Sequence, residues 1–138
     1  MVPHIDLQQL AETLRSDGHP AIDVEGQAIP CVTAFKTIQS QAALFLLRPG
    51  QHIPAHTHTS IDDIFFGVEG RGRIRTWNAG GQPEDRHVEP GTLLAIPPET
   101  PHEVSCADDE FCYLLLQAPR EQYDNISYDV QGGFALEH

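Results

Sequence analysis

The stretch Gly50-Gln51-His52-Ile53-Pro54-Ala55-His56-Thr57-His58 decides the interpretation of this chain. Its last two histidines are separated by one residue. In an extended segment, residues i and i+2 point to the same face. His56 and His58 are therefore predicted to approach one metal ion together. Imidazole suits Zn, Fe, Ni, Cu or Co better than Mg or Ca, so a transition metal is expected.

Two further groups complete a ligand set around these histidines. A carboxylate follows soon after them, at Asp62 or Asp63, and His102 follows a Pro-rich corner at the end of another predicted strand. Three imidazoles and one carboxylate leave room for water or substrate on a five- or six-coordinate metal. The pattern therefore predicts a metal centre that is open to a small molecule.

These segments resemble the two sequence motifs of the cupin superfamily. The first motif is a glycine, five residues, His-x-His, three or four residues, glutamate, six residues and a glycine. The second is a glycine, five residues, Pro-x-Gly, two residues, histidine, three residues and an asparagine. Every spacing is satisfied, by Gly50, His56, His58, Asp63 and Gly70 in the first motif and by Gly91, Pro97, Glu99, His102 and Cys106 in the second.

Three positions depart from the superfamily pattern. Asp63 replaces a glutamate and is one methylene shorter, so it is expected to ligate directly, to act through water or to orient a histidine. Asp62 is its rival as the ligand. Glu99 replaces a glycine, which leads us to expect a turn that avoids a positive φ. Cys106 replaces an asparagine at a position that is usually structural.

The resemblance implies an all-β fold, the cupin double-stranded β-helix or jelly-roll barrel. Residues 1–135 are interpreted as one cupin domain with the metal motifs within 50–106, and residues 136–138 as the remnant of an expression tag. Apolar spacing predicts a short helix over His4–Ser16, capped by Asp6. The strands are expected at 31–38, 42–47, 63–68, 72–77, 92–96 and 111–117, with turns that include Glu69-Gly70 and Ala107-Asp108-Asp109 between them.

Composition excludes several partners. The chain has 138 residues and a formal net charge of −12, and Lys36 is its one lysine. Binding to nucleic acid or to an anionic membrane surface needs clustered cations, so neither is expected. No signal peptide or membrane span is recognised, and three cysteines without CxxC spacing favour a reduced, cytoplasmic setting.

Several polar residues have two interpretations. The strand period places His52 on the face of His56, where it would act as a catalytic acid or base, although a surface position at the rim is the simpler interpretation. Arg71, Arg73 and Arg75 alternate along a predicted strand, and either recognise an anionic substrate or form a solvated outer face, which we favour. Cys106 and Cys112 are interpreted as small buried hydrophobes.

The resemblance implies a metal-dependent enzyme acting on a small organic molecule. Dioxygenase-like chemistry is favoured, isomerase or lyase chemistry is possible, and the alternative is a non-catalytic small-ligand-binding or sensor protein. The expected cofactor is a divalent transition metal, namely Fe, Zn, Ni or Mn, held by His56, His58, Asp63 and His102. Cupins of this size are commonly homodimers, so a homodimer formed through the N-terminal strands is expected.

Overall fold

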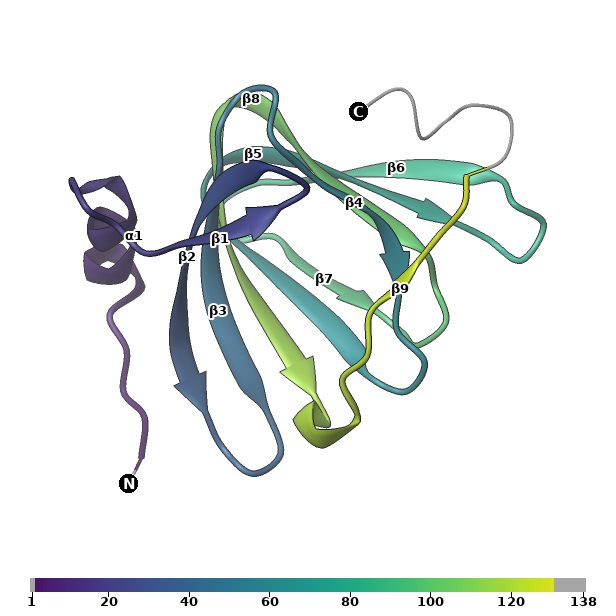
Figure 1. Cartoon of the computed structure of the whole chain (residues 1–138), viewed down its shortest axis with the longest axis horizontal. Coiled ribbons are helices and arrows are strands. Elements are labelled where there is room, and N and C mark those ends of the chain that lie inside the picture. The colour runs from purple at the N-terminus through teal and green to yellow at the C-terminus, as the bar shows by residue number, and fades with distance from the viewer. Residues whose placement is uncertain (1, 131–138) are drawn as a thin grey trace.

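A computed structural model describes residues 2–130 of the chain, and in it nine antiparallel strands curl into a barrel with one helix on the outside (Figure 1). The predicted all-β cupin fold with a short N-terminal helix is thereby confirmed. The elements are α1 Leu7–Arg15, β1 Ala21–Val24, β2 Gln27–Lys36, β3 Gln41–Leu47, β4 His52–Thr57, β5 Asp62–Trp77, β6 Pro83–Val88, β7 Leu93–Ile96, β8 His102–Ala118, the 3-10 helix η1 Arg120–Gln122 and β9 Ile126–Ser127.

The long strands β5 and β8 organise the sheet. Strand β8 pairs with β3, β4 and β5, and its ladder with β5 runs from Asp62↔Ala118 to Thr76↔His102. Asp63 and His102 therefore lie at opposite ends of this ladder. Their side chains nevertheless meet, because β5 and β8 bend sharply and carry both walls of the barrel. This bend is what assembles the site.

Glycines in β5 make the bend possible. The register between β5 and β8 shifts between Gly67 and Glu69 and again between Gly70 and Gly72. Gly70 has a φ of 71°, and a Cβ on Gly72 would lie 2.0 Å from the ring of Phe111. A side chain at either position would meet strain or a clash. The turn predicted at Glu69-Gly70 is therefore wrong, since the chain bends there within one strand.

The turn predicted at Ala107-Asp108-Asp109 is wrong for the same reason. Cys106 pairs with Gly72 and Phe111 with Gly70, so β8 uses five steps where β5 uses two. The extra residues bulge out without ending the strand. The core lies between the two walls and contains Ile29, Leu47, Phe65, Ile74, Val88, Ile96, Val104, Phe111 and Tyr113.

Helix α1 covers the outer face of the sheet. The Asp6 carboxylate accepts hydrogen bonds from the backbone N–H groups of Gln8 and Gln9, as a helix N-cap does. Leu14 is fully buried, and with Ala11 it packs against Leu44, Leu46 and Cys112. The helix predicted over 4–16 is confirmed, although it is shorter at both ends, and Cys112 is confirmed as a small buried hydrophobe.

Some predictions concern residues outside 2–130, and some strands were not predicted. The domain boundary at 135 and the tag remnant Leu136-Glu137-His138 lie outside the described residues. Strands β1, β6 and β9 were not predicted. β6 in particular has no apolar alternation, because all but its last residue are exposed. None of the helices within residues 2–130 is long and apolar enough to cross a membrane.

Candidate metal centre

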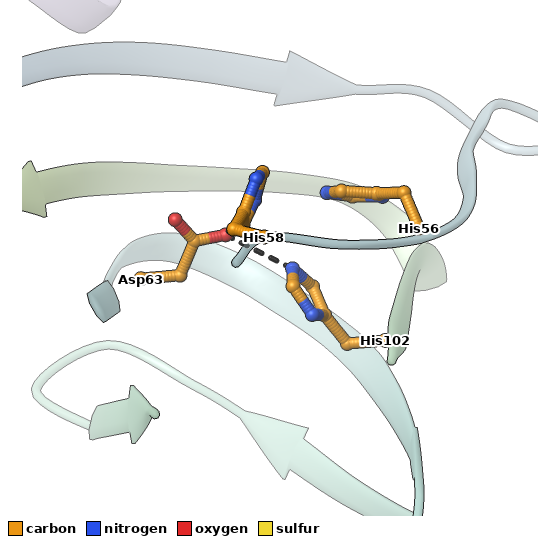
Figure 2. Close-up of side chains that lie close together, drawn as sticks. All are labelled: His56, His58, Asp63 and His102. Carbon is orange, nitrogen blue, oxygen red and sulfur yellow. Dashed lines mark hydrogen bonds and ion pairs between the residues drawn. The ribbon is translucent and has the colours of Figure 1, made fainter. Parts of the chain in front are cut away.

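Four side chains from three strands and one connecting loop converge at one point (Figure 2). His56 lies in β4, and His58 is the first residue after that strand. Asp63 lies in β5, and His102 begins β8. One ligand atom of each lies within 4.8 Å of the others. His58, Asp63 and His102 are buried, and His56 is half-buried. The structure therefore brings together all four residues that the sequence proposed, and His56 and His58 do share a face.

Each histidine has its Nδ1 fixed by a backbone carbonyl. The Nδ1–H of His56 donates to the carbonyl of Pro54 at 2.8 Å, and that of His102 donates to the carbonyl of Thr100 at 2.8 Å. His58 donates to the carbonyl of Asp124. A carbonyl only accepts, so the proton lies on Nδ1 in each ring and Nε2 is the atom left for a metal. Such carbonyl contacts are the usual support of metal-bound histidines.

The carboxylate of Asp63 is fixed as firmly as the rings. Its Oδ1 accepts a hydrogen bond from the side-chain amide of Gln117 at 3.0 Å. Its Oδ2 lies 3.0 Å from Nε2 of His58 and 2.9 Å from Nε2 of His102. Asp62, its neighbour in the sequence, is exposed. Of the two carboxylates, Asp63 is the one that the fold turns into the group (Figure 2).

The donor set fits a divalent cation. With Nδ1 protonated, a neutral imidazole presents only a lone pair at Nε2, and a lone pair about 3 Å from a carboxylate oxygen is repelled unless positive charge lies between them. Protons or one metal ion supply that charge. Burial alone would lower the pKa of His58, but its hydrogen bond with Asp63 raises it and favours a proton there when no metal is bound, whereas burial and the neighbouring ring of His102 lower the pKa of His56 to about 4. Burial alone would raise the pKa of Asp63, but hydrogen bonds from His102 and His58 hold it well below its usual range.

A cavity of about 500 Å³ adjoins these ligands. This size is suited to a small organic molecule. His56, His58 and Asp63 line it on one side, and much of the remaining wall is apolar. That wall includes Phe45, Ile53, Phe65, Val104 and Leu115.

A family model for the cupin domain matches residues 43–116, more than half of the chain. The chain belongs to the cupin family. Among curated proteins, none matches it in sequence.

Solved structures share the cupin fold of this chain. KdgF from Halomonas sp. has a TM-score of 0.63 at 24% identity, with 74% of this chain and 87% of that chain covered. The protein TT1209 from Thermus thermophilus has a TM-score of 0.65 at 22% identity, with 86% and 98% covered. Oxalate decarboxylase from Bacillus subtilis, a protein with Mn(II) centres, has a TM-score of 0.64 at 19% identity, with 78% and 29% covered. At these identities the likeness concerns the fold.

His52 lies apart from the centre of this cupin. The register between β4 and β8 shifts between Ile53 and His56, so three steps on β4 face two on β8. This bulge reverses the alternation on which the His52 prediction depended. Ile53 packs against the core, and His52 is absent from the described residues that line the cavity. An acid–base role for His52 stays a prediction.

The three alternating arginines form ion pairs along the β5–β6 hairpin. Arg71 lies 3.2 Å from Glu89, and Arg75 lies 2.8 Å from Asp85, which also faces Arg73 at 3.9 Å. None of the described residues that line the cavity is an arginine. These contacts support the outer-face interpretation over substrate recognition.

Glu99 corrects one expectation from the second motif. Its φ is 63°, so the turn keeps the positive φ that the family's glycine would adopt, and the prediction that it avoids one is wrong. The backbone N–H of Glu99 donates to the carbonyl of His58 at 2.7 Å, which fixes the turn beside the centre. The hydrogen bond explains why the backbone conformation is kept although the residue has changed.

Residues after β8 also contribute to the site, and no sequence pattern marks them. Strand β9 pairs with β4 at His56↔Ser127, and the carbonyl of Asp124 holds His58. The ring of Tyr123 lies against that of His58, with centroids 5.4 Å apart. A short polar segment carries no periodicity, and a backbone carbonyl carries no residue preference. Between β8 and this segment, Arg120–Gln122 form the short 3-10 helix η1.

Proposed function

We propose that this cupin is a metal-dependent enzyme that acts on a small organic molecule, with oxygen chemistry favoured over isomerase or lyase chemistry. The observation that carries the proposal is the set of Nε2 and carboxylate atoms that converge at the wall of an apolar cavity. A purely structural metal site is normally closed by its protein ligands, whereas three imidazoles and one carboxylate at a cavity leave coordination positions for a substrate.

His56, His58, His102 and Asp63 would hold the metal, for which Fe, Mn, Zn and Ni are the candidates. When bound, such an ion supplies Lewis-acid or redox chemistry to a substrate oxygen or to dioxygen. Gln117 holds Asp63 in place, and the three carbonyls hold the rings. The apolar wall excludes water from the substrate and strengthens polar contacts inside the cavity.

Tyr123 is better placed than His52 to move a proton. Its side chain lines the cavity beside His58. Burial raises its pKa above the usual value, so the hydroxyl is protonated at neutral pH and serves as a donor. The cytoplasmic setting and the homodimer that the sequence suggests belong to this proposal as well.

Turnover with a panel of small molecules tests the proposal. Oxygen uptake is measured with Fe(II)-loaded protein and catechols, thiols or β-diketones, and product formation without oxygen is measured with Zn, Mn and Ni. We expect turnover with at least one pair of metal and substrate. It should be lost in His56→Ala and kept in His87→Ala, because His87 is an exposed histidine of β6. Ligand binding without turnover under any condition would instead indicate a non-catalytic carrier.

A further inference from the structure

A row of polar side chains leads from the metal centre across the cavity wall to Lys36. We propose that the substrate is an organic acid whose carboxylate binds Lys36 while its other end faces the metal centre. The inference rests on the proposed function, because it names the class of molecule that the same cavity would take.

The row follows from the register of four adjacent strands. Lys36 of β2 is paired with Gln41 of β3, Gln41 with Gln117 of β8, and Gln117 with Asp63 of β5. Residues directly opposite each other in antiparallel strands project from the same face. All four side chains accordingly line the cavity.

Hydrogen bonds connect the inner part of the row. The amide of Gln41 donates to Oε1 of Gln117 at 2.9 Å, and the amide of Gln117 donates to Asp63 at 3.0 Å. Each amide nitrogen has two N–H groups, so each keeps one donor for a ligand. The two glutamines therefore form a fixed polar track between the metal ligand Asp63 and the ammonium group of Lys36.

The wall beside this track is mostly apolar. The next register row consists of Thr33, Ala43, Leu115 and Phe65, and the row after it places Phe45 opposite Tyr113. Phe45 and Tyr113 are stacked with ring centroids 5.1 Å apart. A ligand lying along the track would place its carbon skeleton on this apolar surface and its polar ends on Lys36 and the centre.

The charge of the cavity selects an anion at the Lys36 end. Lys36 is the only lysine of the chain, and among the described residues that line the cavity it is the only side chain with an ammonium or guanidinium group. Glu25, which also lines the cavity, precedes β2, whereas Lys36 ends β2, so the two lie at opposite ends of this strand. Asp63 is already paired with His58 and His102.

The spacing sets the length of the ligand. Three steps between strands of about 4.8 Å each amount to roughly 14 Å along the sheet between the backbones of Asp63 and Lys36, and the curl of the sheet shortens this distance across the cavity. The lysine side chain spans part of that distance. A linear acid with about four to eight carbons between its ends would span the remainder.

Paired hydroxamates test this inference on the Zn(II)-loaded protein. The hydroxamate end binds the metal, and the other end carries either a carboxylate or the matching primary amide, with four to eight methylene groups between the ends. Calorimetry gives the Kd of each compound. We expect the best carboxylate to bind at least about 10-fold more tightly than its amide, as a charge-assisted hydrogen bond provides.

Two variants assign the preference to Lys36. Lys36→Met should abolish the preference for the carboxylate, and Arg48→Met should keep it. Arg48 is exposed and outside the cavity, so its loss reproduces the change in net charge alone. In wild-type protein the carboxylate should also protect Lys36 from acylation by an N-hydroxysuccinimide ester, which mass spectrometry detects at this single lysine side chain.

The outcomes separate the two proposals. The proposed substrate class would be overturned by equal Kd values for carboxylate and amide, or by a preference for the carboxylate that survives in Lys36→Met. Metal-dependent binding of both compounds would in that case still support the metal centre. Binding of neither hydroxamate to metal-loaded protein would overturn the proposed function together with the inference.

Discussion

At the scale of single residues, the metal centre depends on a carboxylate shorter than the one the family pattern has at this position. Asp63 reaches the histidines because β5 begins beside them and Gln117 fixes its second oxygen. We predict that Asp63→Asn lowers metal affinity by at least about 10-fold, because a neutral amide is a poor ligand. Asp62→Asn removes an exposed carboxylate one residue away and should leave affinity unchanged. Titration with a fluorescent Zn chelator measures both, and equal effects would show that Asp63 is not a ligand.

Glu99 allows a test of backbone strain. A non-glycine residue at a φ of 63° has an unfavourable contact between its Cβ and the backbone. Glycine relieves this contact but gains entropy in the unfolded chain, so Glu99→Gly should raise the free energy of unfolding by about 0.5–1 kcal/mol. Urea denaturation measures the change. A clear loss of stability would mean that the Glu99 side chain contributes contacts that outweigh the strain.

The metal-ligating side chains could be predicted from the sequence, whereas the backbone contacts that support them could not. His56, His58 and His102 could be found because an i, i+2 pair and a distant third histidine match a spacing pattern. Asp63 could be separated from Asp62 only once the strand showed which one faces inward. Two contacts could not be predicted from the sequence: the hydrogen bond between His58 and the Asp124 carbonyl, and the pairing of Lys36 with Gln41 on adjacent strands. Both depend on how distant segments are aligned in the fold.

At the scale of elements, local signals located strands but not their continuity. Glycines at 67, 70 and 72 look like a turn between two strands, yet they allow β5 to bend against Glu89, Glu110 and Phe111. The distinction between a turn and a bend lies in the partner strand, which a local sequence window does not contain. A separate bulge, between Ile53 and His56 where β4 pairs with β8, reverses the alternation from which the face of His52 was predicted.

The segment after β8 carries an element-scale prediction. The Asp124 carboxylate accepts a hydrogen bond from the backbone N–H of Thr59 at 2.8 Å, and this anchors the carbonyl that holds His58. Asp124→Ala should lower metal affinity by several-fold without removing a ligand, as loss of such supporting contacts does. Glu121→Ala, which removes an exposed acid of η1, is the matched control. A chelator titration measures the metal affinity of both variants. Equal metal affinities for Asp124→Ala and Glu121→Ala would rule out this supporting role.

At the scale of the whole molecule, the edge of β1 that faces away from β2 is relevant to dimer formation. Within residues 2–130, β1 pairs with β2 alone, and its Ile22 is 40% exposed. An edge strand with an exposed apolar residue favours pairing with a second chain. We predict a particle of twice the 15.3 kDa chain mass by light scattering, and its dissociation by Ile22→Lys. A wild-type monomer at all concentrations would contradict the homodimer.

The central claim is that His56, His58, Asp63 and His102 hold one transition metal at the wall of the cavity. The most direct test is metal analysis of protein purified without added metal, by plasma mass spectrometry, on wild-type protein, His56→Ala and the exposed-residue control His87→Ala. We predict about one transition metal per chain in wild type and in His87→Ala, and a large loss in His56→Ala, because metal-bound imidazoles act together. A sub-stoichiometric metal content that His56→Ala leaves unchanged would contradict the claim.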